Sequence, residues 1–189
     1  GVELDPFLEA SRQFIFGLDC DGLDGPDRAR QHYRQSLARL QNAGPETGSR
    51  PISHRERQGI IRFHIALTDC LQAARSPAAD RPPLLSAKTN LERCRDTFAA
   101  VGRPDLVAGV LPHLGEVLKR LQQWEELQVL AETGLKMHLS YGPDRQLARD
   151  YGFMAEVALR RGAWNEALEL AKLALAILSE GDSQSERGA

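Results

Sequence analysis

The feature that most restricts the fold is an internal repeat in the C-terminal half of the chain. Shifting the sequence by 40 residues aligns 108–135 with 148–175, and nine of these 28 aligned positions are identical. Only about two identities would be expected from average residue usage. A self-similarity of this period is typical of stacked helical hairpins, because a single hairpin cannot bury its own apolar face and must pack on its neighbours.

Helical periodicity extends over the rest of the chain. Apolar residues recur at steps of three and four in eight segments, whereas almost no segment alternates with a period of two. Ser53 and Glu56 have the spacing of a capping box, which marks the start of the third segment. We therefore predict an all-α protein of about four helical hairpins, or eight helices, in a single domain at 1–180 with a polar disordered tail at 181–189. The expected hairpins cover 5–42, 53–101, 105–139 and 144–179.

The last hairpin resembles a known repeat family. The sequence YGFMAEVALRRGAWNEALELAKLALAIL at 151–178 is similar to a tetratricopeptide repeat, with Gly162 before the turn and Trp164 after it. In the preceding hairpin, Gly115 and Gly134 take small-residue positions of the same pattern. The resemblance is specific over about the last 70 residues and degenerate before them, and the 40-residue spacing exceeds the usual 34 of the family.

The resemblance implies both a fold and a function. It implies a right-handed α-α superhelix of tetratricopeptide-like hairpins that serves as a non-catalytic protein–protein interaction or scaffolding module, binding a peptide or a partner protein. Longer repeats of this kind resemble those in sensor arms of bacterial signalling proteins. Because the chain begins with Gly rather than Met, we expect a sensor or scaffold segment of a larger bacterial signalling protein.

The same resemblance places polar side chains on a concave groove, which the first helix of each hairpin lines in this family. A ladder of alternating charges would repeat across neighbouring helices. It would act either as a set of surface ion pairs or as hydrogen-bonding groups for an extended peptide. The candidate groove residues are Glu116, Lys119, Arg120, Arg149, Glu156 and Arg160, extended in the third helix by Arg62 and Asp69.

The eighth helix offers a second candidate surface. Its apolar residues occupy more than half of its circumference, which suits a helix that is covered on two sides. We expect Leu170, Leu173 and Ile177 to form an association face. This face would pack either on further repeats or on another chain, and a homodimer formed through it would be isologous.

No pattern of catalytic or metal-binding residues is found in the sequence. The five histidines include no pair at i,i+4, and the acidic segment 19–25 lacks the ligand positions of a calcium-binding EF-hand and is predicted as an interhelical turn. No phosphate-binding loop or hydrolase motif is present. We expect no catalytic residues, no metal and no cofactor. Three widely spaced cysteines, Cys20, Cys70 and Cys94, favour a reducing compartment and hence a cytoplasmic protein.

Two alternative functions remain open. The segment 28–62 holds eight arginines and two acidic residues, which would suit a nucleic-acid-binding helical solenoid. The net charge of −2 and the absence of interleaved aromatic residues disfavour this alternative. The third possibility is a structural spacer or dimerisation domain that associates through the eighth helix. No apolar run approaches the roughly 20 residues that span a bilayer, so we expect no membrane partner.

Overall fold

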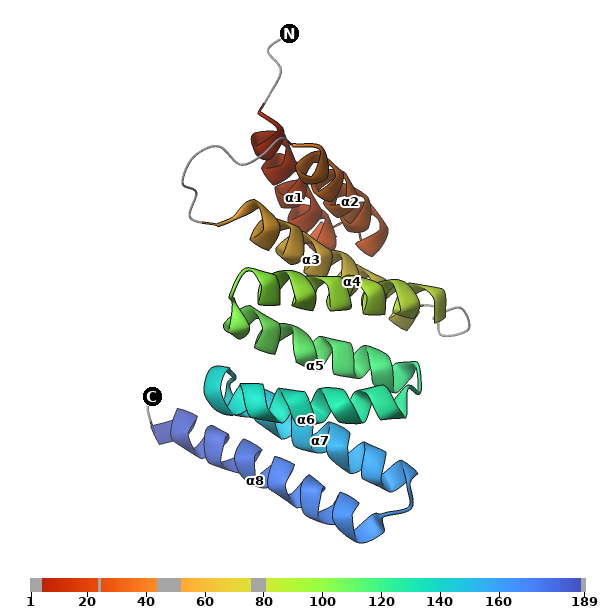
Figure 1. Ribbon diagram of the computed structural model, residues 1–189, viewed down its shortest axis with the longest axis vertical. Coiled ribbons are helices and arrows are strands. Elements are labelled where there is room, and N and C mark those ends of the chain that lie inside the picture. The colour runs from red at the N-terminus through yellow and green to blue at the C-terminus, as the bar shows by residue number, and fades with distance from the viewer. Residues whose placement is uncertain (1–4, 24, 44–51, 76–80, 188–189) are drawn as a thin grey trace. The chain divides into compact units, whose positions relative to one another are not determined.

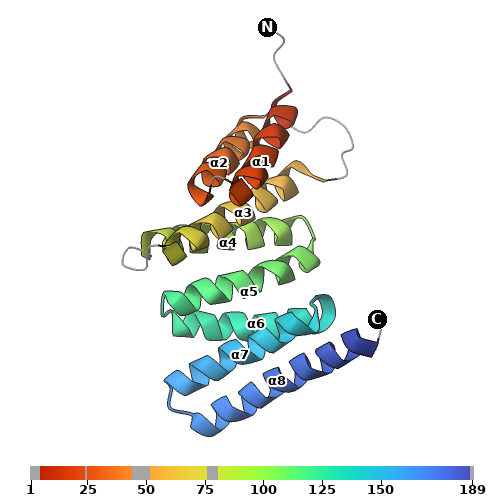
Figure 2. The same ribbon diagram turned by 180° about the vertical axis from the view of Figure 1, so that it is seen from behind.

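The computed structural model describes residues 5–23, 25–43, 52–75 and 81–187, and their secondary structure is helical throughout (Figures 1 and 2). Within these residues there are eight helices, which confirms the predicted all-helical class. They are α1 (Pro6–Leu23), α2 (Pro26–Asn42), α3 (His54–Arg75), α4 (Arg81–Ala100), α5 (Pro104–Arg120), α6 (Trp124–Tyr141), α7 (Asp144–Arg160) and α8 (Trp164–Arg187).

The packing of the helices divides the chain into two compact units. Unit 1 is Gly1–Gly102 and unit 2 is Arg103–Ala189, and the predicted single helical-repeat domain stays a prediction. In unit 1, α1 packs on α2, α2 on α3 and α3 on α4. In unit 2, α5 packs on α6, α6 on α7 and α7 on α8. A division of this kind is compatible with stacked hairpins, because each hairpin contacts only its neighbours.

Two helices extend further than the sequence suggested. The first helix, α1, continues through Leu23, so residues 19–23 are helical rather than part of a turn. The last helix, α8, continues through Arg187, so the predicted disordered tail is helical up to that residue; residues 188 and 189 lie outside the described part. Both extensions have the same physical reason, since each further residue of an existing helix adds a backbone hydrogen bond without a new nucleation cost.

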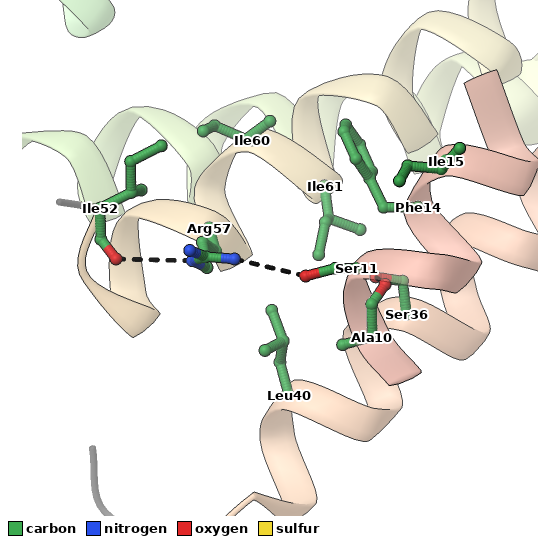
Figure 3. A pocket seen from close by; sticks show the side chains of 10 residues that line it. All are labelled: Ala10, Ser11, Phe14, Ile15, Ser36, Leu40, Ile52, Arg57, Ile60 and Ile61. Atoms are coloured by element: carbon green, nitrogen blue, oxygen red, sulfur yellow. Dashed lines mark hydrogen bonds between the residues drawn. The ribbon is translucent and has the colours of Figure 1, made fainter. Parts of the chain in front are cut away.

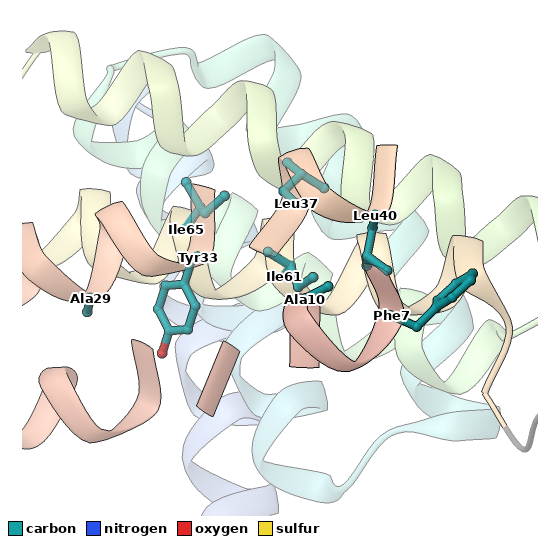
Figure 4. Close-up of a cluster of buried hydrophobic side chains, with 8 residues drawn as sticks. All are labelled: Phe7, Ala10, Ala29, Tyr33, Leu37, Leu40, Ile61 and Ile65. Carbon is teal, nitrogen blue, oxygen red and sulfur yellow. The ribbon is translucent and has the colours of Figure 1, made fainter. Parts of the chain in front are cut away.

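The first core of unit 1 lies between α1, α2 and α3 (Figure 4). Its centre is Tyr33 of α2, whose ring is fully buried against Gly17 of α1. A Cβ atom at Gly17 would lie 2.4 Å from the Tyr33 ring, so only glycine lets the two helices approach this closely. Ser36 of α2 also donates a 2.6 Å hydrogen bond to the carbonyl of Ala10 on α1. The cluster consists of Phe7, Ala10, Ala29, Tyr33, Leu37, Leu40, Ile61 and Ile65.

The helix ends of unit 1 follow the capping signals in the sequence. The Ser53 hydroxyl accepts a 3.1 Å hydrogen bond from the backbone N–H of Glu56, which confirms the predicted cap of α3. At the start of α1, the carboxylate of Asp5 accepts a 3.0 Å hydrogen bond from the backbone N–H of Phe7. These side chains satisfy backbone donors that have no partner inside the helix.

The internal repeat is visible in the helix boundaries of unit 2. Pro104 and Asp144 begin α5 and α7 at positions 40 residues apart, and Trp124 and Trp164 begin α6 and α8 with the same spacing. Gly115 of α5 contacts the ring of Phe153 on α7, where an added Cβ atom would lie only 2.3 Å from a ring carbon. The close approach of α5 and α7, the first helices of the two hairpins, therefore depends on a glycine.

The two turns of unit 2 differ in one residue, which leads to a stability prediction. Gly162 has φ +75° in the second turn, and its counterpart in the first turn is Gln122 with φ +59°. A non-glycine residue pays about 1–2 kcal/mol in this left-handed region, while glycine adds about 0.5–1 kcal/mol of backbone entropy cost. We expect Gln122→Gly to raise the free energy of unfolding by about 0.5–1 kcal/mol in urea denaturation.

The neighbouring residue provides a control for this substitution. Gln123 has φ −90°, so Gln123→Gly gains no relief of strain and should lower the free energy of unfolding. Equal effects of the two substitutions would show that the left-handed conformation of Gln122 is not the cause.

Candidate binding surfaces

The charge ladder predicted for a groove lies on α5 and α7 of unit 2, where Lys119 connects its acidic members. The Lys119 Nζ atom is 3.2 Å from Glu116 Oε2 and 3.2 Å from Glu156 Oε1. Burial alone would lower the pKa of Lys119, but hydrogen bonds to both carboxylates and their charges raise it above its usual value. Lys119 therefore forms an ion pair with each of the two glutamates. Because all three remain partly exposed, the pairs contribute little to stability.

The arginines of the ladder have other surroundings. The Arg160 guanidinium lies over the Trp124 ring of α6, 4.8 Å from its centroid, which is the geometry of a cation–π interaction. Arg149 of α7 is exposed. The pKa of His113 on α5 is lowered by the burial of the imidazole and by the charge of Arg149. Arg120 is exposed in the last turn of α5. Arg160 thus contacts the neighbouring hairpin, whereas Arg149 and Arg120 are exposed. The charged side chains of the ladder therefore differ in their surroundings.

The two candidate groove residues of unit 1 require a correction. Asp69 of α3 is fully buried, so its assignment to an open groove is wrong. Its carboxylate lies 2.6 Å from Arg30 Nη2 on α2 and accepts a 2.6 Å hydrogen bond from Ser86 on α4. The phase of α3 turns this position toward two neighbouring helices, which the sequence alone left open. Arg62, on the same helix, is half-buried, and burial and the charge of Arg93 lower its pKa.

The arginines of segment 28–62 are spread over different environments. Arg30 belongs to the buried ion pair, and Arg57 donates a 3.4 Å hydrogen bond to Ser11 of α1. Others of this set, including Arg34 and Arg55, are exposed on α2 and α3, and residues 44–51 lie outside the described part of the chain. Among the described arginines, the arrangement does not favour one continuous phosphate-binding surface.

A buried polar pair joins three helices of unit 2. Asp150 of α7 forms a hydrogen bond with Nδ1 of His138 on α6, and both residues are about 2% exposed. The Nε2–H group of His138 donates a 2.8 Å hydrogen bond to the carbonyl of Ala108 on α5. Gly134 leaves room for the carboxylate, because a Cβ atom there would lie 2.6 Å from Asp150 Oδ1. The pair was not found by sequence reasoning, in which His138 was assigned no role.

We expect this pair to make stability depend on pH. Burial alone lowers the pKa of His138, but hydrogen bonds to Asp150 and Ala108 and the charge of Asp150 outweigh it, so this pKa is raised. Burial raises the pKa of Asp150, opposed by its hydrogen bond to His138. A group whose pKa rises on folding stabilises the folded state below its unfolded pKa, about 6.5 for histidine, and loses this contribution as pH rises through the folded pKa.

Urea denaturation of the wild type and of Asp150→Asn at several pH values tests this expectation. The difference in free energy of unfolding between the two proteins should shrink as pH rises from about 6 to about 9. All other titrating groups are common to the two proteins, so their contributions to the pH dependence cancel in this difference. A difference that stays constant over this range would contradict the assigned role of the pair.

The exposed apolar surface of α8 includes only part of the face that we predicted. Leu170 and Ile177 are partly buried, and of the predicted face only Leu173 is mainly open, at 48% exposure. A different set of side chains along the helix is exposed, and we call it the α8 stripe. It consists of Trp164 (68% exposed), Leu168 (55%), Leu175 (67%) and Leu178 (39%). Leu170 and Ile177 are partly buried because α7 covers α8 from a direction that could not be read from the apolar pattern, and association through this face stays a prediction.

The face of α6 that corresponds to the α8 stripe is covered by α7. The residues 40 positions before the stripe are Trp124, Gln128, Leu135 and His138. Three of them contact side chains of α7 or of the residue that follows it: Trp124 lies under Arg160, Gln128 accepts a hydrogen bond from Arg161 directly after α7, and His138 binds Asp150. The contact of α6 with α7 thus shows how another helix can cover a face that corresponds to the α8 stripe.

The described residues offer few reactive groups. Burial raises the pKa of the Cys94 thiol to about 12, against the opposing charge of Arg62. Among the described residues, no three or more His, Cys, Asp or Glu side chains are grouped so that they could hold a metal ion. None of the helices, searched over the same residues, combines the length and apolarity needed to cross a membrane.

Comparisons with known proteins identify the fold. No model of a known protein family matches the chain, and no curated protein matches it. Among solved structures, BtubC (BKLC) from P. vanneervenii superposes with a TM-score of 0.76 at 16% identity, covering 96% of this chain and 68% of that one. Aspartyl phosphate phosphatase F from Bacillus subtilis superposes with a TM-score of 0.71 at 13% identity, covering 95% of this chain and 43% of that one.

These similarities concern the fold alone. Both neighbours are helical-repeat proteins, which supports the predicted class of helical hairpins. The chain spans about two thirds of the first neighbour and less than half of the second. Membership of the tetratricopeptide family specifically stays a prediction from the residues quoted above.

Proposed function

We propose that this chain is a non-catalytic protein-interaction module whose α8 stripe binds an amphipathic helix of a partner protein. The observation that carries the proposal is the exposure of Trp164, Leu168, Leu175 and Leu178 along one helix face. Contiguous exposed apolar side chains of this kind mark interaction sites, whereas single exposed ones do not. The helical-repeat fold supports the proposal, because such folds present helix faces for packing.

The repeat within unit 2 indicates what kind of helix would fit. On α6, the covering helix supplies Asp150 to His138 and, ten residues later, Arg160 to Trp124. On α8 the tryptophan is retained as Trp164, whereas the histidine is replaced by Leu178. A partner helix would therefore place an apolar residue near Leu178, where α7 has an aspartate, and a cation over Trp164.

Site-specific photo-crosslinking tests the proposal in cells of the source organism. A photoreactive amino acid at Leu168 or Leu175 should form adducts with another protein. The same amino acid at Glu132, an exposed position of α6, should form none and serves as the matched control. Adducts that disappear when Leu178→Glu is added would place the contact on the α8 stripe.

The outcomes separate the alternatives. Adducts with a second copy of the chain would favour the structural dimerisation domain over a module that binds another protein. Adducts with nucleic acid at Arg34 and not at the α8 stripe would favour the nucleic-acid-binding alternative. An absence of adducts at both Leu168 and Leu175 would contradict the proposed function.

A further inference from the structure

A cavity of about 250 Å³ opens in unit 1 between α1, α2 and the start of α3 (Figure 3). Apolar side chains from all three helices and from Ile52, which precedes α3, form most of its wall. Of the ten described residues that line it, three contribute polar side chains. The lining residues are Ala10, Ser11, Phe14, Ile15, Ser36, Leu40, Ile52, Arg57, Ile60 and Ile61.

Arg57 is the charged residue of this lining, and its partners are neutral. Its Nη1 group donates to the Ser11 hydroxyl and its Nε group to the carbonyl of Ile52, both at 3.4 Å (Figure 3). These distances exceed the usual 2.7–3.2 Å range of N–H···O hydrogen bonds. Among the described residues, Arg57 forms no ion pair. The other polar groups are occupied, since Ser11 donates to the carbonyl of Phe7 and Ser36 to that of Ala10.

We propose that this cavity binds an acidic peptide segment, whose apolar side chain enters the cavity and whose carboxylate pairs with Arg57. The cavity is smaller than the roughly 300–1,000 Å³ of pockets for drug-sized ligands, so its volume suits a single anchoring side chain. A carboxylate would replace two long hydrogen bonds of Arg57 with short, charge-assisted ones. The site lies in unit 1 and uses no residue of α8, so it is independent of the proposed function.

Isoleucine methyl groups make the cavity directly observable by NMR. Four of the six isoleucines of the chain, Ile15, Ile52, Ile60 and Ile61, line it. Ile177 lies in unit 2 and serves as an internal reference. In protein with labelled isoleucine δ1-methyl groups, the acetylated and amidated tripeptide Asp-Leu-Asp should shift the four cavity signals in a saturable manner and leave Ile177 unchanged. A Kd of about 1–10 mM is expected for so small a probe.

Two control peptides separate the contributions of charge and apolar anchor. Asn-Leu-Asn, which lacks the carboxylates, and Asp-Ala-Asp, which lacks the anchor, should each bind about tenfold more weakly than Asp-Leu-Asp. Equal shifts with Asn-Leu-Asn would overturn the role of Arg57. Octanoate tests for a free amphiphile, and saturable binding of octanoate without binding of the peptide would overturn the peptide as the occupant.

Matched variants assign the charge to one arginine. Arg57→Gln should weaken binding of Asp-Leu-Asp about tenfold and leave binding of Asn-Leu-Asn unchanged. Arg55→Gln removes the same charge two residues away from an exposed position that does not line the cavity, and should have little effect. Unchanged signals of Ile65 and Ile177 establish that each variant is folded. If Arg55→Gln and Arg57→Gln weaken binding equally, or if no cavity signal saturates with the wild type, the proposal is wrong.

Discussion

Asp69→Ala is expected to lower the free energy of unfolding of the protein by about 3 kcal/mol. The substitution removes the carboxylate that lies 2.6 Å from Arg30 and 2.6 Å from the Ser86 hydroxyl. Arg30 is then left with its charge largely withdrawn from water, and its remaining described partners are neutral groups such as Gln72. Breaking one side of a buried ion pair is costly for this reason, even where the intact pair contributes little.

An exposed ion pair of the same chain provides the control. Arg103 and Asp105 approach to 2.7 Å, nearly the same distance, but both side chains are 41–50% exposed. Asp105→Ala should therefore change stability far less than Asp69→Ala, because water can replace the lost partner. Urea denaturation of both variants measures the difference. Similar losses in the two variants would show that burial of Asp69 does not determine the cost.

The second large effect is expected from Gly115→Ala, which should destabilise the protein by about 2–3 kcal/mol. The added Cβ atom would lie 2.3 Å from the ring of Phe153, and that ring is itself buried in unit 2. No real contact is this short, so α5 and α7 must separate or the ring must leave its position. Overpacking of this kind strains side chains and backbone together.

Gly109, on the same helix, gives the opposite expectation. A Cβ atom at Gly109 would meet no atom within 4 Å. Gly109→Ala should therefore stabilise the protein by about 0.5–1 kcal/mol through helix propensity alone. In thermal or urea denaturation, the free energy of unfolding should fall in Gly115→Ala and rise in Gly109→Ala. Changes of the same sign would contradict the close contact of α5 with α7. Combining Gly115→Ala with Phe153→Leu should recover part of the loss, and a strictly additive result would contradict the contact.

The helices were predictable because their signals are local. Apolar steps of three and four, the Ser53 cap and the glycines near turns depend only on neighbouring residues, and the 40-residue shift located the same boundaries in both hairpins of unit 2. The far ends of α1 and α8 were missed because a polar sequence does not end a helix by itself. Gly102 and Gly162, in contrast, mark turns with positive φ.

The candidate surfaces were less predictable, because they depend on which side of a helix its neighbours cover. Asp69 and Leu170 both lie on apolar or mixed helices, and a rotation of one or two residue positions decides whether such a side chain is buried or open. The Arg57 cavity was missed because Ile52 lies in a Pro/Gly/Ser-rich linker that carries no periodic signal. The ion pair of Lys119 with Glu156 was foreseen as one of two alternatives, since the repeat brings equivalent positions of α5 and α7 together.

The pairing of His138 with Asp150 also affects how the repeated hairpins find their correct neighbours during folding. Hairpins of similar sequence can exchange places between two molecules, so that α7 of one copy docks on α8 of another. In such an exchanged arrangement Asp150 would face Leu178 instead of His138, and its carboxylate would be buried without a hydrogen-bond donor. The buried contact of His138 with Asp150, present on α6 and absent from α8, thus helps to distinguish two helix faces that share their tryptophan.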